Sequence, residues 1–539
     1  MEETIGGGRK APSFDRRKRS YERSRYRRRR EDPEMVPRLP PSNEEISLDQ
    51  FKAFILRHRY IILITLLALA LRICMLKYES FWIDEAMTGL RSRWDFEYLL
   101  DEIVSGDQMP FYFFMTWSIS KYLGNSVLVL RGLSVIFGLI SMIPIYLIAR
   151  RFGKEAALIS ILLFAVSPTM LYYSQEARMY MFMVFLSAFS IHFFLNIVDQ
   201  EREKRTVSLI MLLFINILLV YTHYFGILFV FLELISMVGL LLFHNIRSKR
   251  TIGLSTISKR IWPLVLSGLS FLPWFIYQQR EQSLSEKTTG GSLGLGLDLI
   301  PETFRFLGGQ YTAIYRNDTS IAVVVGYIFL FLFIISLIIF LMRRYREQEG
   351  LNFLVLSAIL LVISPLAAYA VSHWFTPMYN HRYFIFLAAP FFIILGAALS
   401  SLRVWLAGYN EALKVPIIAA VTVLVLVSLT VDADQLIRRD KADWKGGIDF
   451  VLENQRPSDV VIPFPDHEQM LIYYYTDELD IRLLGAIDDQ EEFLRDNPRV
   501  WVLFYETEPI DEQPLIRELN DRDVEEYRVE DIIIRLYWT

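Results

Sequence analysis

The stretch Ser80–Gly89 (S-F-W-I-D-E-A-M-T-G) places two adjacent carboxylates, Asp84 and Glu85, directly after the first strongly apolar segment of the chain. Trp82 precedes the pair and apolar residues follow it, so the carboxylates lie close to where a membrane surface is expected. A solvated turn does not need this arrangement, whereas a catalytic carboxylate at the mouth of a membrane cavity does. Acid–base chemistry is therefore the first function that these residues suggest.

Three further polar clusters carry groups that could bind a substrate or stabilise charge. They are Y-Y-S-Q-E-A-R-M-Y (Tyr172–Tyr180, with Glu176, Arg178 and Tyr180), T-H-Y-F-G (with His223) and N-H-R-Y-F (with His381 and Arg382). Any one of them could be a helix cap or a charge that extends to the membrane surface. Arg131, near the outer end of another apolar segment, could likewise meet a lipid phosphate or extend to the surface. Four clusters at the same membrane boundary favour a shared site.

The apolar residues come in long blocks, which is typical of a polytopic membrane protein. At 53% hydrophobic residues, the chain of 539 residues is more apolar than a soluble protein of its length. Its single cysteine, Cys74, excludes an internal disulfide framework and a cysteine-based metal site. Eleven segments are predicted to cross the membrane, approximately 60–75, 127–149, 155–172, 179–198, 207–221, 224–243, 261–277, 320–342, 352–372, 383–400 and 415–431.

The charge pattern orients these segments. Pro110–Tyr122 is apolar but short, whereas a span needs about 20 residues. If it does not cross, the basic loops all lie inside, as the positive-inside rule requires: 150–154, 199–205, 247–260, 343–349 and 401–414. We therefore predict that Pro110–Tyr122 is a re-entrant or interfacial helix, that the N-terminus is cytoplasmic, and that all four polar clusters face the outside. Trp82–Arg93 and Asp95–Ile103 are predicted to be amphipathic helices at the membrane surface.

Composition divides the chain into three parts. Residues 1–50 form a basic arm, predicted to be disordered, that acts as a topology signal or binds anionic lipid head groups or RNA. Of these the topology signal is the better supported, so we expect no nucleic-acid partner. Residues 55–431 form the membrane domain, with a first external loop at 77–125. Residues 432–539 are acidic and form a soluble external domain.

The C-terminal part alternates strand-like and helix-like runs, which predicts a small α/β domain. Strands are predicted at 460–465, 481–485, 500–505 and 531–538, and helices at 468–475, 488–495 and 514–520. A glycine-rich phosphate loop is missing from this sequence, so we assign no nucleotide site to it.

The combined motifs resemble the membrane glycosyltransferases of the GT-C fold, in the family 39 branch of protein O-mannosyltransferases and lipid A aminoarabinose transferases. The resemblance rests on the D-E pair, a later apolar helix that begins at a proline, S-Q-E-A-R-M-Y, H-Y-F-G, and R-Y-F followed by Pro390. It covers residues 55–431, and the trailing external domain also fits. Where many members have His-Pro-Pro-Leu-Tyr this chain has Q-M-P-F-Y (108–112), so no role is carried over to that position.

The resemblance implies a polytopic α-helical GT-C protein in the cell membrane, with about 11 transmembrane helices and an extracytoplasmic α/β domain. It also implies a sugar donor on a polyprenyl phosphate and transfer on the outer side, to a lipid, glycan or protein acceptor. A single displacement would invert the anomeric centre. The long prenyl tail would lie between spans that open to membrane lipids.

The same resemblance suggests a role for each candidate residue. Asp84 is the expected base, and Glu85 orients it or binds the sugar. Arg178 and Arg382, with His381 second, would stabilise the phosphate that leaves. Tyr180 and His223 would complete the substrate site. Glu176 would position the acceptor, hold Arg178, or bind a divalent cation together with Asp84, since some relatives use a metal and others do not.

Two other functions compete with glycosyl transfer. A transporter or flippase for lipid-linked sugars would use the same arginines and carboxylates to bind a substrate without reacting with it. Such a protein often shows internal repeats and broken helices at the membrane midplane, and neither is evident in the sequence. A scaffold protein that binds partners through its external domain would leave the Asp-Glu and Glu-x-Arg clusters without a purpose.

Overall fold

The computed structural model describes most of the membrane-embedded and C-terminal residues. The described residues are 48–74, 76–106, 108–199, 202–248, 254–282, 299–309, 320–344, 348–374, 379–407, 415–438 and 441–539. They belong to two units, Met1–Arg59 and Tyr60–Thr539. In the first unit the described residues begin helix α2 (Leu48–Ile73), and the rest of the predicted basic arm lies outside the described residues. The residues of the candidate site and the whole C-terminal sheet belong to the second unit.

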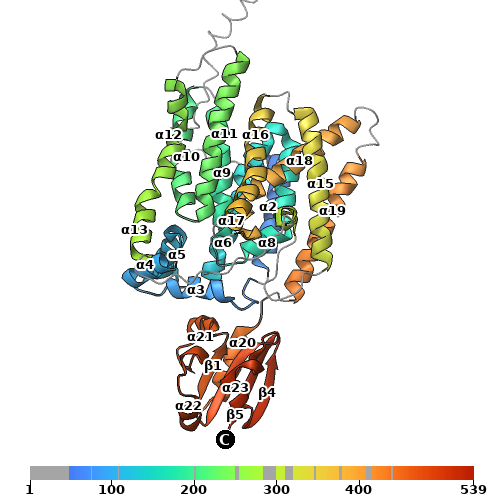
Figure 1. Cartoon of the computed structure of the whole chain (residues 1–539). Helices are drawn as coiled ribbons and strands as arrows, with labels where there is room; N and C mark the ends of the chain where they lie inside the picture. The colour runs from blue at the N-terminus through green and yellow to red at the C-terminus, as the bar shows by residue number, and fades with distance from the viewer. Residues whose placement is uncertain are drawn as a thin grey trace, which may run out of the picture. The chain divides into compact units, whose positions relative to one another are not determined.

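A helix or helix pair occupies every segment predicted to span the membrane (Figure 1). They are α2, α6 (Val127–Ala149), α7 (Lys154–Ala165) with α8 (Pro168–Ser174), α9 (Tyr180–Asp199), α10 (Arg202–Val220), α11 (Tyr224–Ser248), α12 (Leu254–Leu269) with α13 (Leu272–Gln282), α15 (Ser320–Arg344), α16 (Gln348–Ala358) with α17 (Ser364–Trp374), η4 (His381–Leu387) with α18 (Ala388–Ala407), and α19 (Val415–Arg438). Six described helices are long and apolar enough to span a membrane, or seven if the bent pair α7–α8 is one span. The full count of eleven therefore remains a prediction.

The helices between the first two predicted spans are short. They are α3 (Ile83–Arg91), α4 (Phe96–Ser105) and α5 (Pro110–Leu123), and they lie together at one end of the helical bundle (Figure 1). With 14 residues, α5 is about 21 Å long, less than the roughly 30 Å thickness of a hydrocarbon core. Its length is that of the predicted re-entrant or interfacial helix. The positions of α3 and α4 match the two predicted amphipathic helices.

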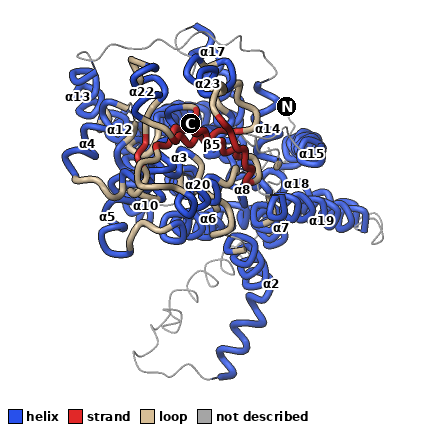
Figure 2. Tube along the Cα trace, turned by 90° about the horizontal axis from the view of Figure 1, so that it is seen from below, coloured by secondary structure: helices blue, strands red, loops and turns tan. Residues whose placement is uncertain are grey.

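The C-terminal residues form one five-stranded sheet with helices on both faces. Its elements are α20 (Trp444–Asn454), β1 (Val460–Phe464), α21 (Gln469–Tyr475), β2 (Asp480–Ile481), α22 (Gln490–Asp496), β3 (Arg499–Tyr505), α23 (Pro514–Leu519), β4 (Asp523–Val529) and β5 (Ile532–Trp538). The strand order is β2-β1-β3-β5-β4, in which β1 pairs in parallel with β2 and β3, and β5 pairs antiparallel with β3 and β4. Figure 2 shows α20 on one side of the sheet and α22 and α23 on the other.

Two apolar clusters fill this domain, one on each face of the sheet. Val502 and Ile516 belong to the cluster under α22 and α23. The other cluster contains Trp444 and Leu503, and it continues without a break into Phe81 and Leu90 of the predicted first external loop. The C-terminal domain therefore shares a core with the segment that carries Asp84 and Glu85.

Candidate active site

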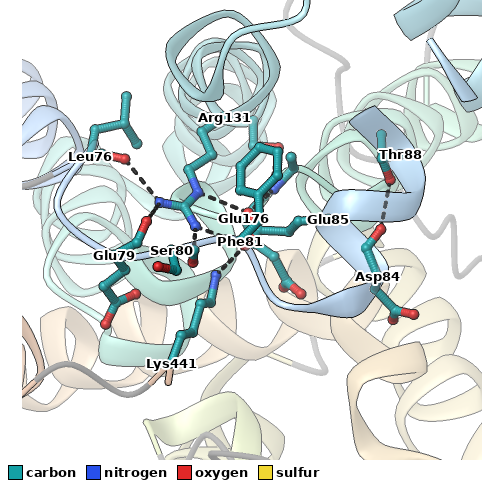
Figure 3. A network of polar contacts seen from close by, with 12 residues as sticks. Leu76, Glu79, Ser80, Phe81, Asp84, Glu85, Thr88, Arg131, Glu176 and Lys441 are labelled. Carbon is teal, nitrogen blue, oxygen red and sulfur yellow. Dashed lines mark hydrogen bonds and ion pairs between the residues drawn. The ribbon is translucent and has the colours of Figure 1, made fainter. Parts of the chain in front are cut away.

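Helix α3 directs the side chains of its two adjacent carboxylates to different surroundings. Asp84 and Glu85 lie in its first turn, where the unpaired backbone N–H groups favour negative charge. Consecutive residues of an α-helix project about 100° apart, so the two side chains leave the helix in different directions. Glu85 is completely buried, whereas 29% of the Asp84 side chain is exposed. Figure 3 shows the Asp84 carboxylate pointing away from the residues that surround Glu85.

Glu85 is held by four donors in the interior (Figure 3). Arg131 Nε and Nη2 each lie 2.8 Å from a carboxylate oxygen, and Lys441 Nζ lies 2.7 Å from Oε2. The backbone N–H of Ala177 donates to Oε1 at 2.8 Å. Burial alone would raise the pKa of Glu85, but the charges of Arg131 and Lys441 outweigh burial and lower this pKa to about 2. Both carboxylate oxygens of Glu85 are thus occupied by buried hydrogen-bond donors, so Glu85 is not positioned to bind a substrate.

Arg131 fixes the loop that precedes Asp84. In addition to Glu85, its guanidinium donates to the backbone carbonyls of Leu76, Glu79 and Ser80, each at 3.0 Å. The group also lies over the Phe81 ring, with 5.0 Å from Cζ to the ring centroid. Arg131 is 1% exposed, so it neither meets a lipid phosphate nor extends to the membrane surface. Both expectations for this residue are wrong, because the loop folds back over the end of α6 and covers it.

Asp84 faces two arginines that come from distant parts of the sequence. Its Oδ2 lies 3.7 Å from Arg178 Nη2 and 3.5 Å from Arg382 Nη1. Both distances are ion-pair distances that exceed a direct hydrogen bond. Arg178 Nη1 also donates to the Asp84 carbonyl at 3.3 Å. The site therefore brings together one carboxylate and two guanidinium groups, and the carboxylate does not use up the hydrogen-bond donors of either guanidinium.

Aromatic rings surround Arg382. Its Cζ lies 5.6 Å from the Trp82 ring, 5.8 Å from Tyr180 and 5.6 Å from Tyr383. Within the described segments, three buried donors here have no hydrogen-bond partner: the Nε atoms of Arg178 and Arg382 and the indole N–H of Trp82. Buried donors normally have partners, so these three mark a place where an acceptor-rich ligand such as a phosphate would bind.

Glu176 is within electrostatic reach of the buried network around Glu85 and of the two arginines. It is 1% exposed, and its Oε2 finds no hydrogen-bond partner among the residues that the structure describes. Burial raises the pKa of Glu176 to about 7, against the opposing charge of Lys441. The carboxyl group therefore titrates near neutral pH, where it is able to hold or release a proton.

The bend that carries Glu176 and Arg178 is fixed by its neighbours. Gln175 Nε2 donates to three carbonyls at the end of α2, the shortest bond being 2.8 Å to Cys74. Ser134 on α6 donates to the carbonyl of Glu176 at 2.6 Å. Together with the bond from Ala177 to Glu85, these contacts set the position of Arg178 relative to Asp84.

The two predicted histidines have different surroundings. His223 packs against Tyr383, with ring centroids 4.7 Å apart, and its Nδ1 accepts from the Phe225 N–H at 3.2 Å. Burial, followed by the charges of the two arginines, lowers the pKa of His223 to about 3, so the ring is neutral with its proton on Nε2. His381 instead faces Glu302 on α14 (Leu299–Gly308), with 3.9 Å from Nδ1 to Oε2. Among the described residues, no contact between His381 and Asp84 is found.

The predicted site residues are thus only partly brought together. Asp84, Arg178, Tyr180 and Arg382 meet directly, and the charges of the arginines reach Glu176 and His223. Three residues of this region were not predicted as site residues from the sequence: Trp82, Tyr383 and Lys441. Trp82 and Tyr383 lie within two positions of predicted site residues in the sequence, and this proximity could have identified them. Lys441 is 356 positions from Glu85 and gave no local signal.

A divalent cation does not fit well at Asp84. No group of three or more His, Cys, Asp or Glu side chains within the described ranges is arranged to hold a metal ion. The neighbours of Asp84 are two guanidinium groups, which repel a cation and attract an anion. The suggested metal pair Asp84 and Glu176 stays a prediction that the surrounding charges do not favour.

Comparison with known proteins is in line with this architecture. Residues 107–276 match the family model of dolichyl-phosphate-mannose-protein mannosyltransferase. ArnT from Cupriavidus metallidurans in the apo state aligns with a TM-score of 0.54 at 13% identity, over 90% of this chain and 98% of that one. The same protein bound to undecaprenyl phosphate gives a TM-score of 0.53 at 12% identity, over 91% and 98%.

A second solved structure and a search of curated sequences were also compared with the chain. The oligosaccharyltransferase of Archaeoglobus fulgidus, in a complex with Zn and sulfate, aligns with a TM-score of 0.48 at 13% identity, over 82% of this chain and 67% of that one. No curated protein sequence matches the chain. The alignment with ArnT over nine-tenths of the chain confirms the predicted fold class, a polytopic helical membrane protein with a C-terminal α/β domain.

Proposed function

We propose that this chain, a membrane glycosyltransferase of the GT-C type, transfers a sugar from a polyprenyl-phosphate donor to a hydroxyl or amine of a lipid, glycan or protein acceptor. The reaction would take place on the outer side of the membrane. The ArnT structure bound to undecaprenyl phosphate supports this class of donor. The proposed sites and their roles rest on the geometry around Asp84.

The observation that carries the proposal is the meeting of Asp84 with Arg178 and Arg382. A carboxylate is a proton acceptor, and two guanidinium groups are a strong binding site for phosphate. Glycosyl transfer from a phosphate needs both functions within one sugar's width. The ion-pair distances of 3.5 and 3.7 Å leave each guanidinium free to donate to another anion.

The proposed step is a single displacement. The acceptor O–H or N–H bond breaks as its proton passes to Asp84, and the acceptor atom bonds to the anomeric carbon. The bond between that carbon and the phosphate oxygen breaks, and its electron pair leaves on the polyprenyl phosphate. Arg178 and Arg382 stabilise the charge that the phosphate gains. Attack opposite the leaving group inverts the anomeric centre.

The other residues of the site support this step. Tyr180, Tyr383 and Trp82 offer aromatic faces beside Arg382 against which a sugar ring or the first prenyl unit can pack. Neutral His223 can donate from Nε2 to a sugar hydroxyl, but it supplies no charge to the phosphate. His381 is assigned no contact with the phosphate, since it faces Glu302.

The two buried carboxylates receive different roles. We assign Glu85 to positioning Asp84, because its oxygens are already occupied by four donors. Glu176, with one unpaired oxygen and a pKa near neutrality, is suited to bind a hydroxyl of the acceptor or the sugar. Either partner would satisfy an oxygen that is otherwise costly to bury.

The test is a donor panel. Purified protein in lipid nanodiscs is incubated with undecaprenyl phosphates that carry different pentoses, hexoses and amino sugars, and release of free undecaprenyl phosphate is measured by mass spectrometry. The wild-type protein should consume one class of donor, and Asp84→Asn should bind it without releasing the lipid phosphate. The same assay with a chelator measures any need for a divalent cation.

The alternative function, a flippase for lipid-linked sugars, predicts a different outcome in the same system. In proteoliposomes a flippase would move the intact donor between leaflets and leave the bond between sugar and phosphate unbroken. Transfer or hydrolysis of that bond, lost in Asp84→Asn, supports the transferase. Movement without cleavage, unchanged in Asp84→Asn, would refute it.

A further inference from the structure

The start of the C-terminal domain reaches into the interior beside the candidate active site. Lys441 is 5% exposed and its Nζ lies 2.7 Å from Glu85 Oε2. Two residues later, Asp443 Oδ1 accepts from the Ser80 hydroxyl at 2.7 Å. The segment that enters the domain is therefore bonded to the loop that precedes α3.

The body of the domain contacts α3 as well. The Tyr475 hydroxyl accepts from the Phe81 N–H at 2.7 Å, and the Tyr474 ring stacks on the Phe81 ring with 4.8 Å between centroids. The Tyr474 ring also lies against Gly89, where a Cβ would come within 2.4 Å of it. Arg93, just beyond α3, donates to the Tyr474 carbonyl at 2.8 Å. Both ends of α3 are thus held by the C-terminal domain.

Glu85 links these contacts to the reacting groups. It is bonded to Lys441 on one side and to the Ala177 N–H on the other, one residue before Arg178. It also follows Asp84 directly in α3. A shift of the Glu85 carboxylate would therefore move Asp84 and Arg178 relative to each other, although Glu85 itself touches no substrate.

We propose that Lys441 is a positioning residue of the active site, and that the C-terminal domain supplies it to hold Asp84 and Arg178 in register through Glu85. This inference rests on the proposed function of Asp84 and Arg178. Without Lys441, Glu85 would keep Arg131 as its one cationic partner among the residues described, and α3 would lose its ion pair with the C-terminal domain.

The charge of Lys441 also acts on Glu176. After burial, Lys441 is the largest influence on the pKa of Glu176 and the largest that lowers it, while Glu85 raises this pKa and Arg382 and Arg178 lower it. Removing the lysine charge should raise this pKa further, so that Glu176 stays protonated to a higher pH. A loss of packing alone, with the charge kept, would not produce that change.

The experiment compares Lys441→Met with Lys445→Met in full-length protein in nanodiscs. The Lys445 side chain is 54% exposed and pairs with Asp449 one turn along α20, so its loss should change nothing measurable. We expect Lys441→Met to lower kcat about 10- to 100-fold, with the donor KM changed much less, because misplacement of reacting groups mainly affects the chemical step. The pH profile of the remaining activity should shift to higher pH, and Lys441→Arg should restore part of the rate.

A second measurement does not depend on catalysis. Hydrogen exchange of the amides in 80–91 should become faster in Lys441→Met and stay unchanged in Lys445→Met. If no sugar transfer occurs even in the wild-type protein, the proposed function fails while exchange still tests the positioning. Normal kcat, an unshifted pH profile and unchanged exchange in Lys441→Met would overturn the inference.

Discussion

At the scale of single residues, two neighbouring carboxylates have opposite environments. Asp84 is partly exposed between two arginines, and Glu85 is buried among four donors. The difference arises from one 100° step around α3 and from a loop that folds back over Arg131. The sequence predicted that the pair was important, but nothing local to it determined which carboxylate faces outward.

Arg382 provides the first prediction at this scale. Replacing it with alanine removes a charge-assisted contact with the phosphate, which is worth about 1.5–3 kcal/mol. We therefore expect Arg382→Ala to weaken binding of undecaprenyl phosphate about 10- to 100-fold, measured by ligand-induced thermal stabilisation in nanodiscs. Arg305→Ala is the control, since Arg305 pairs with Glu302 and Tyr327 and not with Asp84. Unchanged affinity in Arg382→Ala would remove this residue from the phosphate site.

Glu176 provides a prediction about pH. Its pKa is raised in the folded protein to about 7 from 4.5, so between these values the folded state binds more protons than the unfolded state. The contribution of this group to stability is present below about pH 4.5 and is lost as pH rises toward 7, by about 3 kcal/mol. Glu176→Gln should abolish this part of the decline.

The measurement is the difference in melting temperature between wild type and Glu176→Gln at pH 5 and pH 7.5. The melting temperature of the variant should rise relative to that of the wild-type protein as the pH increases. Glu453→Gln, at an exposed position of α20, should show a constant difference. A constant difference for Glu176→Gln would mean that the carboxyl group is not desolvated as the structure indicates.

At the scale of elements, hydrophobic length predicted the helices well, because a span is a long apolar run and needs no partner to be visible. The short α5 could be distinguished from the membrane spans by its length and by the charge of the loops that follow it. Strand β4 (D-V-E-E-Y-R-V) was missed, since it is an edge strand with mostly exposed, charged residues and lacks the alternation of a half-buried strand. Helix α20 was missed because it contains two consecutive glycines, Gly446 and Gly447, which lower helix propensity.

The contact between α3 and α21 gives a prediction at the scale of elements. An alanine Cβ at Gly89 would lie 2.4 and 2.6 Å from two atoms of the Tyr474 ring. That ring is stacked on Phe81, and its hydroxyl donates to the Asn125 carbonyl at 3.0 Å, so it has little freedom to move. We expect Gly89→Ala to destabilise the contact by about 1–3 kcal/mol.

Hydrogen exchange measures this effect directly, as faster exchange in α3 and α21 than in the wild-type protein. Gly239→Ala is the matched control, because a Cβ at Gly239 in α11 would meet no atom within 4 Å. That variant should be at least as stable as wild type, since alanine has the higher helix propensity. Equal protection of α3 in both variants would show that the two helices are not in the close contact described.

At the scale of the whole molecule, the loops predicted to share a side do meet. Arg151 pairs with Asp199, Asn352 donates to the same carboxylate, and Arg403 pairs with Glu155, so four loop ends predicted to lie inside are joined. The candidate site joins segments that were all predicted to lie outside. The grouping of the loops into two sets, one at each end of the helical bundle, could therefore be predicted from their charge. The bond from Lys441 to Glu85 could not, because a single sequence carries no signal for a pair so far apart.

The side of the membrane on which the site lies is the last prediction. In a Cys74→Ser background, Glu525→Cys on the exposed edge strand β4 should react with a membrane-impermeant maleimide on intact cells. Lys259→Cys, at the exposed start of α12 in a basic loop, should react only after permeabilisation. This labelling pattern is expected because the basic loops stay in the cytoplasm and an odd number of predicted spans separates them from the C-terminal domain. The reverse labelling pattern would place Asp84 in the cytoplasm and contradict transfer on the outer side.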